Sequence, residues 1–180
     1  MPRITPITAK SDLAPEHHAV ADGVMKVFGH IRGPFSMLLH SPRLAERLLP
    51  LIPFFREQCV VEAKLRFAAI LTATREREAA YVWAAQVAQA RRSGLPDATI
   101  ELIRTKGDPG KLSVEEREVV NYTRQLMRTN RVDQATFDAL KNRYGAQWLV
   151  ELTAAINYIG FVSGIANAFE VAPPPDGEKI

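Results

Sequence analysis

Apolar residues recur along this chain with the spacing of α-helices. In residues 15–28, for example, Val20, Val24, Val27 and Phe28 fall along one side of a helix. Alternating runs of β-branched residues joined by Asn-Gly or Asp-Gly turns, which would indicate strands, do not occur in the sequence. The pattern therefore predicts an all-α protein.

Glycines, prolines and capping residues divide this pattern into about seven to nine helices. Ser113 and Glu116 form a capping box at the start of one helix, and Asp133 is expected to cap the next. Pro50 or Pro53 is expected to end or kink an earlier helix. The predicted helices cover residues 15–28, 42 to about 50, 61–74, 78–93, 96–105, 113–130, 133–144 and 146–171.

The chain is interpreted as a single domain, residues 1–180, because no linker-like segment divides it. Its 180 residues are enough to bury a substantial core. Residues 1–12 are expected to form an N-terminal arm. A run of prolines at 173–175 stops the last helix, so residues 172–180 are expected to form a mobile tail.

The helices predicted at 61–74 and 146–171 are the most apolar. The segment from Leu152 to Phe169 holds eighteen residues without a charge, but several of them are polar. Because polar groups inside a membrane are costly, a helix buried in an assembly explains this segment better than a membrane span. The apolar surface of these helices predicts a homo-oligomer. No membrane partner is expected. Since no signal peptide is recognisable, the expected location is the cytoplasm.

Charge and cysteine content exclude other classes of protein. The net charge is +3, and no aromatic residues interleave with the arginines as single-strand binding requires, so no nucleic-acid partner is expected. Cys59 is the single cysteine, which excludes an internal disulfide. None of the four histidines is spaced as a metal ligand, so no metal is expected.

The stretch from Arg66 to Gly94 resembles the carboxymuconolactone decarboxylase and alkylhydroperoxidase (AhpD-like) superfamily. The likeness rests on Arg66-Phe67-Ala68-Ala69-Ile70-Leu71 followed by Ala80-Tyr81-Val82-Trp83-Ala84-Ala85-Gln86. The order and spacing of weaker matches around Gly33-Pro34, residues 112–118, 133–137 and 151–169 extend it over most of the chain. The resemblance implies an all-helical domain that assembles as trimers or hexamers.

The residues of the family's thiol relay are missing from this chain. Peroxidase members carry Glu, eleven residues, Cys, two residues, Cys, three residues and His, and the corresponding positions are Phe67, Ala79, Val82 and Gln86. The decarboxylase-like branch often shows Tyr-x-Trp-x-x-His, of which Tyr81 and Trp83 remain and Gln86 replaces the histidine. Glutamine forms hydrogen bonds but cannot shuttle a proton near neutral pH.

Five residues are candidates for a functional site. His30 and Arg32 share a glycine-bounded turn, where an imidazole can transfer a proton and a guanidinium can hold a carboxylate. Trp83 and Gln86 share a helical face and, by the resemblance, lie where the family binds substrate. Tyr81 lies about 160° from Trp83 around the helix axis at 100° per residue, so it faces another side.

Three functions remain open on this evidence. The first is an enzyme without a cofactor that acts on a small carboxylated organic compound, as a decarboxylase or a related lyase, hydrolase or isomerase, with catalytic His30 and substrate-binding Arg32, Tyr81, Trp83 and Gln86. The second is an alkylhydroperoxidase that uses Cys59. The third is a non-catalytic oligomeric protein that binds a small molecule.

Overall fold

The computed structural model describes residues 2–180, and that part of the chain is helical and contains no strand. The predicted all-α fold is confirmed. Eight of the ten α-helices have seven residues or more. The α-helices are α1 (His18–Phe28), α2 (Pro34–Leu38), α3 (Pro42–Leu48), α4 (Leu51–Pro53), α5 (Ala63–Glu76), α6 (Ala80–Arg92), α7 (Asp97–Arg104), α8 (Val114–Thr129), α9 (Gln134–Tyr144) and α10 (Ala146–Ala168).

Capping residues begin and end these helices where the sequence indicated. The Ser113 side chain accepts a hydrogen bond from the Glu116 backbone N–H at 3.3 Å, and α8 starts there. Asp133 caps α9 in the same way, through the Thr136 N–H at 2.8 Å. Gly29, with φ of 75°, ends α1 in the left-handed conformation that glycine adopts without strain.

Short turns connect the regular helices. The 3-10 turns η1 (Lys10–Asp12) and η2 (Pro15–His17) precede α1, so the predicted helix over 15–28 becomes α-helical at His18. The two prolines at 50 and 53 bound the short α4, which continues into the π-helical turn η3 (Phe54–Gln58). A last 3-10 turn, η4 (Pro109–Lys111), leads into α8.

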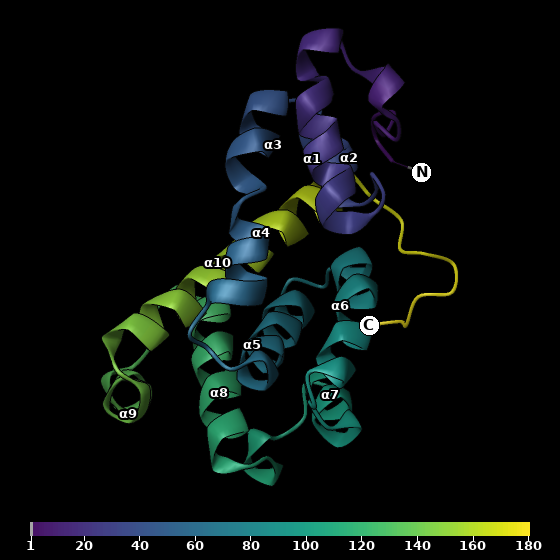
Figure 1. Cartoon of the computed structure of the whole chain (residues 1–180). Helices are drawn as coiled ribbons and strands as arrows, with labels where there is room; N and C mark the ends of the chain where they lie inside the picture. Colours follow the sequence, from purple (N-terminus) through teal and green to yellow (C-terminus); the bar gives the residue numbers. More distant parts are fainter. Residues whose placement is uncertain (1) are drawn as a thin grey trace.

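The helices enclose two hydrophobic cores that α10 joins. The larger core lies among α5, α6, α7, α8 and α10, and the smaller among α1, α2 and α3. α10 runs diagonally between the two groups (Figure 1). Tyr158, on α10, packs against both cores, so the two groups of helices are held together along this helix.

α10 has 23 residues, and its most apolar 18-residue window has a mean hydropathy of 1.5, which makes the helix long and apolar enough to cross a membrane by length and composition. Its neighbours account for one side of it: 44% of its most apolar window is buried against the rest of the protein. It packs against α2, α5, α6 and α9, as a core helix does.

Both ends of the chain contact the helices. In the N-terminal arm, the Arg3 N–H donates to the Phe169 carbonyl at 3.0 Å, and its guanidinium pairs with Glu170 at 2.7 Å. The C-terminal segment leaves α10 and returns to α6 (Figure 1), where Glu178 pairs with Arg91. The mobile tail stays a prediction, and the ion pair of Glu178 with Arg91 is an interaction that would restrict its motion.

Candidate functional site

The three candidates on α6 lie in three different surroundings. Trp83 is completely buried in the larger core, and its indole N–H has no hydrogen-bond partner. Tyr81 is half-buried and faces the turn between α1 and α2. Gln86 is also half-buried. Trp83 and Tyr81 therefore face different sides of the helix, as their angular separation implies, and Trp83 acts as a packing residue.

The turn between α1 and α2 is pressed against the ring of Tyr81. A Cβ atom at Gly33 would lie 2.2 Å from Tyr81 Cε1, so only glycine allows this approach. Gly33 also has φ of 63° and ψ of −144°, a conformation that other residues rarely adopt. The glycine thereby brings the turn of His30 and Arg32 next to α6, which the sequence spacing alone does not reveal.

Arg32 and Tyr81 form the polar part of this contact. Arg32 is exposed and makes no ion pair with the described residues. Burial raises the pKa of the Tyr81 phenol, and the positive charge of Arg32 lowers it by a smaller amount. Near neutral pH, the site therefore presents an unpaired guanidinium beside a neutral hydroxyl, which is a suitable pair for a carboxylate.

His30 lies at the outer side of the same turn. It is exposed, and its ring stacks on Phe28 with 6.3 Å between ring centroids and 18° between planes. The Arg56 guanidinium lies over Phe28, 5.4 Å from its centroid, and donates to the Val27 carbonyl at 3.0 Å. The His30 side chain therefore belongs to a cluster with Phe28 and Arg56, whereas the charge of Arg32 acts on Tyr81.

Three of the four positions that the resemblance assigns to a thiol relay hold apolar packing residues, and the fourth holds the half-buried Gln86. Ala79 and Val82 are buried at 0% and 3% exposure. Phe67 is half-buried against the larger core. No group at these positions accepts or releases a proton near neutral pH, because alanine, valine and phenylalanine have none to exchange.

Cys59 follows η3 and is half-buried. Burial is the main cause that raises the pKa of its thiol, and Glu151 adds to the effect. Arg66 acts in the opposite direction but does not reverse the shift. The thiol is therefore protonated near neutral pH, whereas a peroxidatic cysteine must be a thiolate.

Two of the other three histidines contact backbone carbonyls. His40 Nε2 lies 2.9 Å from the Thr5 carbonyl, and His18 Nε2 lies 3.1 Å from the Leu13 carbonyl. Within residues 2–180, no group of three His, Cys, Asp or Glu side chains is arranged to hold a metal ion. His30 is the histidine nearest to Arg32 in the sequence, on the turn that contacts Tyr81.

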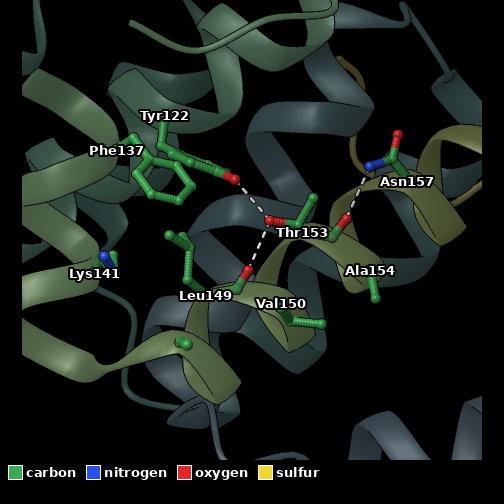
Figure 2. Close-up of a pocket in the computed structure, with 9 residues that line it drawn as sticks. Tyr122, Phe137, Lys141, Leu149, Val150, Thr153, Ala154 and Asn157 are labelled. Carbon is green, nitrogen blue, oxygen red and sulfur yellow. Dashed lines mark hydrogen bonds between the residues drawn. The ribbon is translucent and has the colours of Figure 1, made fainter. Parts of the chain in front are cut away.

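Two hollows on the surface lie away from α6. The first, of about 470 Å³, is an apolar groove among α8, α9 and α10. Figure 2 shows the hydrogen bond across it between Tyr122 Oη and Thr153 Oγ1, which are 2.7 Å apart. Lys141 is the one charged residue among those that line it.

The second hollow, of about 460 Å³, lies beside α7 and η4. Its lining includes Glu116, whose side chain is 5% exposed and pairs with Lys64 at 2.9 Å. Burial raises the pKa of Glu116, but the bonds to Lys64 and Ser113 outweigh burial and hold it below its usual range. Neither hollow includes any of the five candidate residues.

Solved structures with the same arrangement of helices include proteins of the AhpD type. A peroxidase-related protein with an AhpD core from Ralstonia eutropha JMP134 matches with a TM-score of 0.75 over 96% of this chain and 95% of its own, at 15% identity. The chain has the AhpD-like fold. No protein-family model matches the sequence, and neither does any curated protein.

Three further structures with this fold, from two proteins, widen the range of chemistry found on it. The debrominase Bmp8 matches with a TM-score of 0.74 over 96% of this chain and 94% of its own, at 18% identity. A cysteine-to-alanine variant of Bmp8, in complex with 2,3,4-tribromopyrrole, matches equally well at 19% identity, over 97% of this chain and 95% of its own. A protein of unknown function from Agrobacterium tumefaciens, considered for antioxidant defence, matches with a TM-score of 0.70 over 81% of this chain and all of its own, at 18% identity.

Proposed function

We propose that this AhpD-like protein is an enzyme without thiol chemistry that acts on a small carboxylated organic compound beside Tyr81. The observation that carries the proposal is the contact of Gly33 with the Tyr81 ring, which brings the turn of Arg32 against α6, so that the positive charge of Arg32 acts on the neutral phenol. The apolar residues at positions 67, 79 and 82 support it, because they leave no thiol relay in the core.

Each polar residue of this site has a distinct role in the proposal. Arg32 holds a carboxylate of the substrate through charge-assisted hydrogen bonds. The Tyr81 hydroxyl donates a hydrogen bond to a substrate oxygen. His30, which is exposed on the same turn, gives or takes a proton at carbon, the step that decarboxylation, lyase and isomerase reactions share.

The two alternatives have less support. A peroxidase that uses Cys59 needs a reactive thiolate, and burial raises the pKa of this thiol. A non-catalytic binding protein is favoured by one observation, the complete burial of Trp83 where a pocket wall was expected. Binding without turnover would distinguish it from the enzyme.

The binding step is tested first, with benzoate and malonate as probes in calorimetric or NMR titrations. Arg32→Ala is expected to weaken carboxylate binding roughly 10- to 100-fold, because a hydrogen bond to a charged group contributes about 1.5–3 kcal/mol. Arg92→Ala is the matched control, since Arg92 is also exposed and unpaired among the described residues but lies at the far end of α6. Equal loss in both variants would contradict a site at Arg32.

Turnover is tested by screening small carboxylic acids for loss of CO₂ or isomerisation. For any substrate found, His30→Ala is expected to lower kcat by ~10²–10⁴ while the affinity for benzoate is kept. The helical circular-dichroism signal should not change, because His30 is exposed. If Cys59→Ser abolished turnover and His30→Ala did not, a thiol mechanism would replace this one.

A further inference from the structure

One side of α10 is exposed along its whole length and carries no charge. The side consists of the residues at positions 146, 150, 154, 157, 161, 164 and 168, and all seven are exposed. At 100° per residue they fall within about 80° around the helix axis, so they form one narrow stripe. We call these seven residues the α10 stripe.

Large apolar side chains of this stripe face solvent in the single chain. Val150 is 66% exposed and Phe161 is 40% exposed, and Phe137 of α9 is 37% exposed at the neighbouring groove. No exposed residue of α10, inside or outside the stripe, is charged. A helix side that faces water normally carries charged residues, and a large exposed apolar patch usually marks an interface.

When two copies of the stripe lie antiparallel, the large residues of one copy face the small residues of the other. If a second α10 runs antiparallel with Asn157 opposite Asn157, the large Phe161 faces the small Ala154, and Val150 faces Gly164. The ends match as well, Ala146 facing Ala168. We propose that the α10 stripe is a two-fold contact between two copies of this chain, with the two helices antiparallel and centred on Asn157.

Asn157 is suited to the centre of such a contact. Its side-chain amide donates to the Thr153 carbonyl at 2.9 Å, which leaves a second N–H and an acceptor oxygen. Figure 2 shows that oxygen directed away from the bond to Thr153. Two such amides related by a two-fold axis can each donate to the other. One polar residue in an apolar seam fixes its register, because any shift leaves the amide without a partner.

The groove among α8, α9 and α10 provides space at the required place. It has a volume of about 470 Å³, and Val150, Ala154 and Phe137 contribute to its walls. In the antiparallel register, Phe161 of the second copy lies opposite Ala154 and therefore at this groove. The same contact produces a dimer alone or a hexamer when three dimers combine, whereas a bare trimer has no two-fold axis.

Cysteine crosslinking tests both the face and the direction of the helices. In a Cys59→Ser background, Asn157→Cys is expected to give a disulfide-linked dimer under mild oxidation, because the two residues meet at the axis. Ala146→Cys should not crosslink with itself, since antiparallel helices place its two copies roughly 33 Å apart at 1.5 Å per residue. A mixture of Ala146→Cys and Ala168→Cys should crosslink. Crosslinking of position 146 with itself would show parallel helices and overturn the proposed register.

Light scattering after size exclusion tests the contact without crosslinks. Phe161→Glu is expected to raise the dissociation constant of the dimer at least ~100-fold, because it places two charges in an apolar seam. Val114→Glu is the control, since Val114 is 46% exposed on α8 and lies outside the stripe. Ala154→Phe should also weaken association, and adding Phe161→Ala should restore it by exchanging the large and small partners.

Three results would overturn the proposal. One is a wild-type protein that stays monomeric at about 100 μM, roughly 100-fold above a micromolar dissociation constant. Another is an oligomer that Phe161→Glu leaves unchanged. The third is binding of the monomer to lipid vesicles through this face, which would show that a membrane covers the stripe.

Discussion

The two sides of α6 have different surroundings. On one side, Trp83 is fully buried and its neighbours at the relay positions are apolar. On the other, Tyr81 lies against a turn that carries Arg32 and His30. The comparison teaches that, within this AhpD-like fold, one side of α6 is closed by apolar packing while the other lies against a turn with polar side chains. The side of Trp83 is expected to control stability, and the side of Tyr81 to control binding.

The largest effect is expected on the buried side. Trp83→Ala should lower the free energy of unfolding by about 3–5 kcal/mol, the usual cost of removing a buried tryptophan. Trp83→Phe should cost much less, because the indole N–H that it removes has no hydrogen-bond partner. Denaturant unfolding followed by circular dichroism measures both. A Tyr81→Ala variant as unstable as Trp83→Ala would show that the two sides do not differ in this way.

The second effect concerns the backbone that joins the turn to Tyr81. Gly33→Ala should lower the free energy of unfolding by about 1–3 kcal/mol from strain alone, and more from the collision with the Tyr81 ring. Gly29→Ala is the matched control, with φ of 75° but no atom within 4 Å of the added Cβ, so it reports only the left-handed strain. Adding Tyr81→Ala should recover part of the loss at Gly33 and none at Gly29.

A smaller effect is expected on the acidity of Tyr81. Because Arg32 lowers the pKa of this phenol, Arg32→Ala should raise it further. A raised pKa in the folded state means that the stabilisation by the neutral phenol is complete below the ordinary value of about 10 and is lost as the pH rises through the folded-state pKa. The phenolate absorbance of wild type minus Tyr81→Phe isolates this titration. An unchanged midpoint in Arg32→Ala would show that the two residues do not interact.

The smallest effect is expected at Cys59. Its raised pKa predicts that iodoacetamide modifies it more slowly at neutral pH than a free cysteine, with the rate increasing only at alkaline pH. Cys59→Ser should change the free energy of unfolding by about 1 kcal/mol or less, since the residue is only half-buried. Rapid modification at neutral pH would point to an activated thiol and reopen the peroxidase hypothesis.

The sequence predicted the helices well because their signals are local. Ser113 and Asp133 cap the helices they precede, and Gly29 ends α1, all through contacts within four residues. The all-α fold was therefore predictable from spacing and capping residues, and the likeness to AhpD-type proteins came from the resemblance of residues 66–94. The 3-10 start at Pro15 and the π-turn after α4 were not, because they depend on how prolines pack.

The site was less predictable because its contacts are long-range. Glu62 and Arg66 lie four residues apart, a spacing that favours a pair across one helical turn. Instead, Glu62 accepts from the Trp148 indole at 2.9 Å, and Arg66 donates to the Val61 carbonyl at 2.6 Å. Likewise, periodicity placed Tyr81 and Trp83 on different sides of α6 without revealing which side meets Arg32. The glycine at 33 was the available signal, since a glycine inside a turn often marks a close approach.

The contact between the N-terminal arm and the end of α10 has a consequence for how the protein is made. Arg3 binds the carbonyl of Phe169, and α2 packs against α10, so segments that are synthesised before the larger core meet a partner that is synthesised after it. During translation, the core of α1 to α3 stays incomplete until α10 has left the ribosome. Contacts between segments so far apart in the sequence form late, and apolar surface is exposed in the meantime. Nascent chains stalled before residue 146 should therefore depend on chaperones, and release of α10 should be the step that ends this dependence.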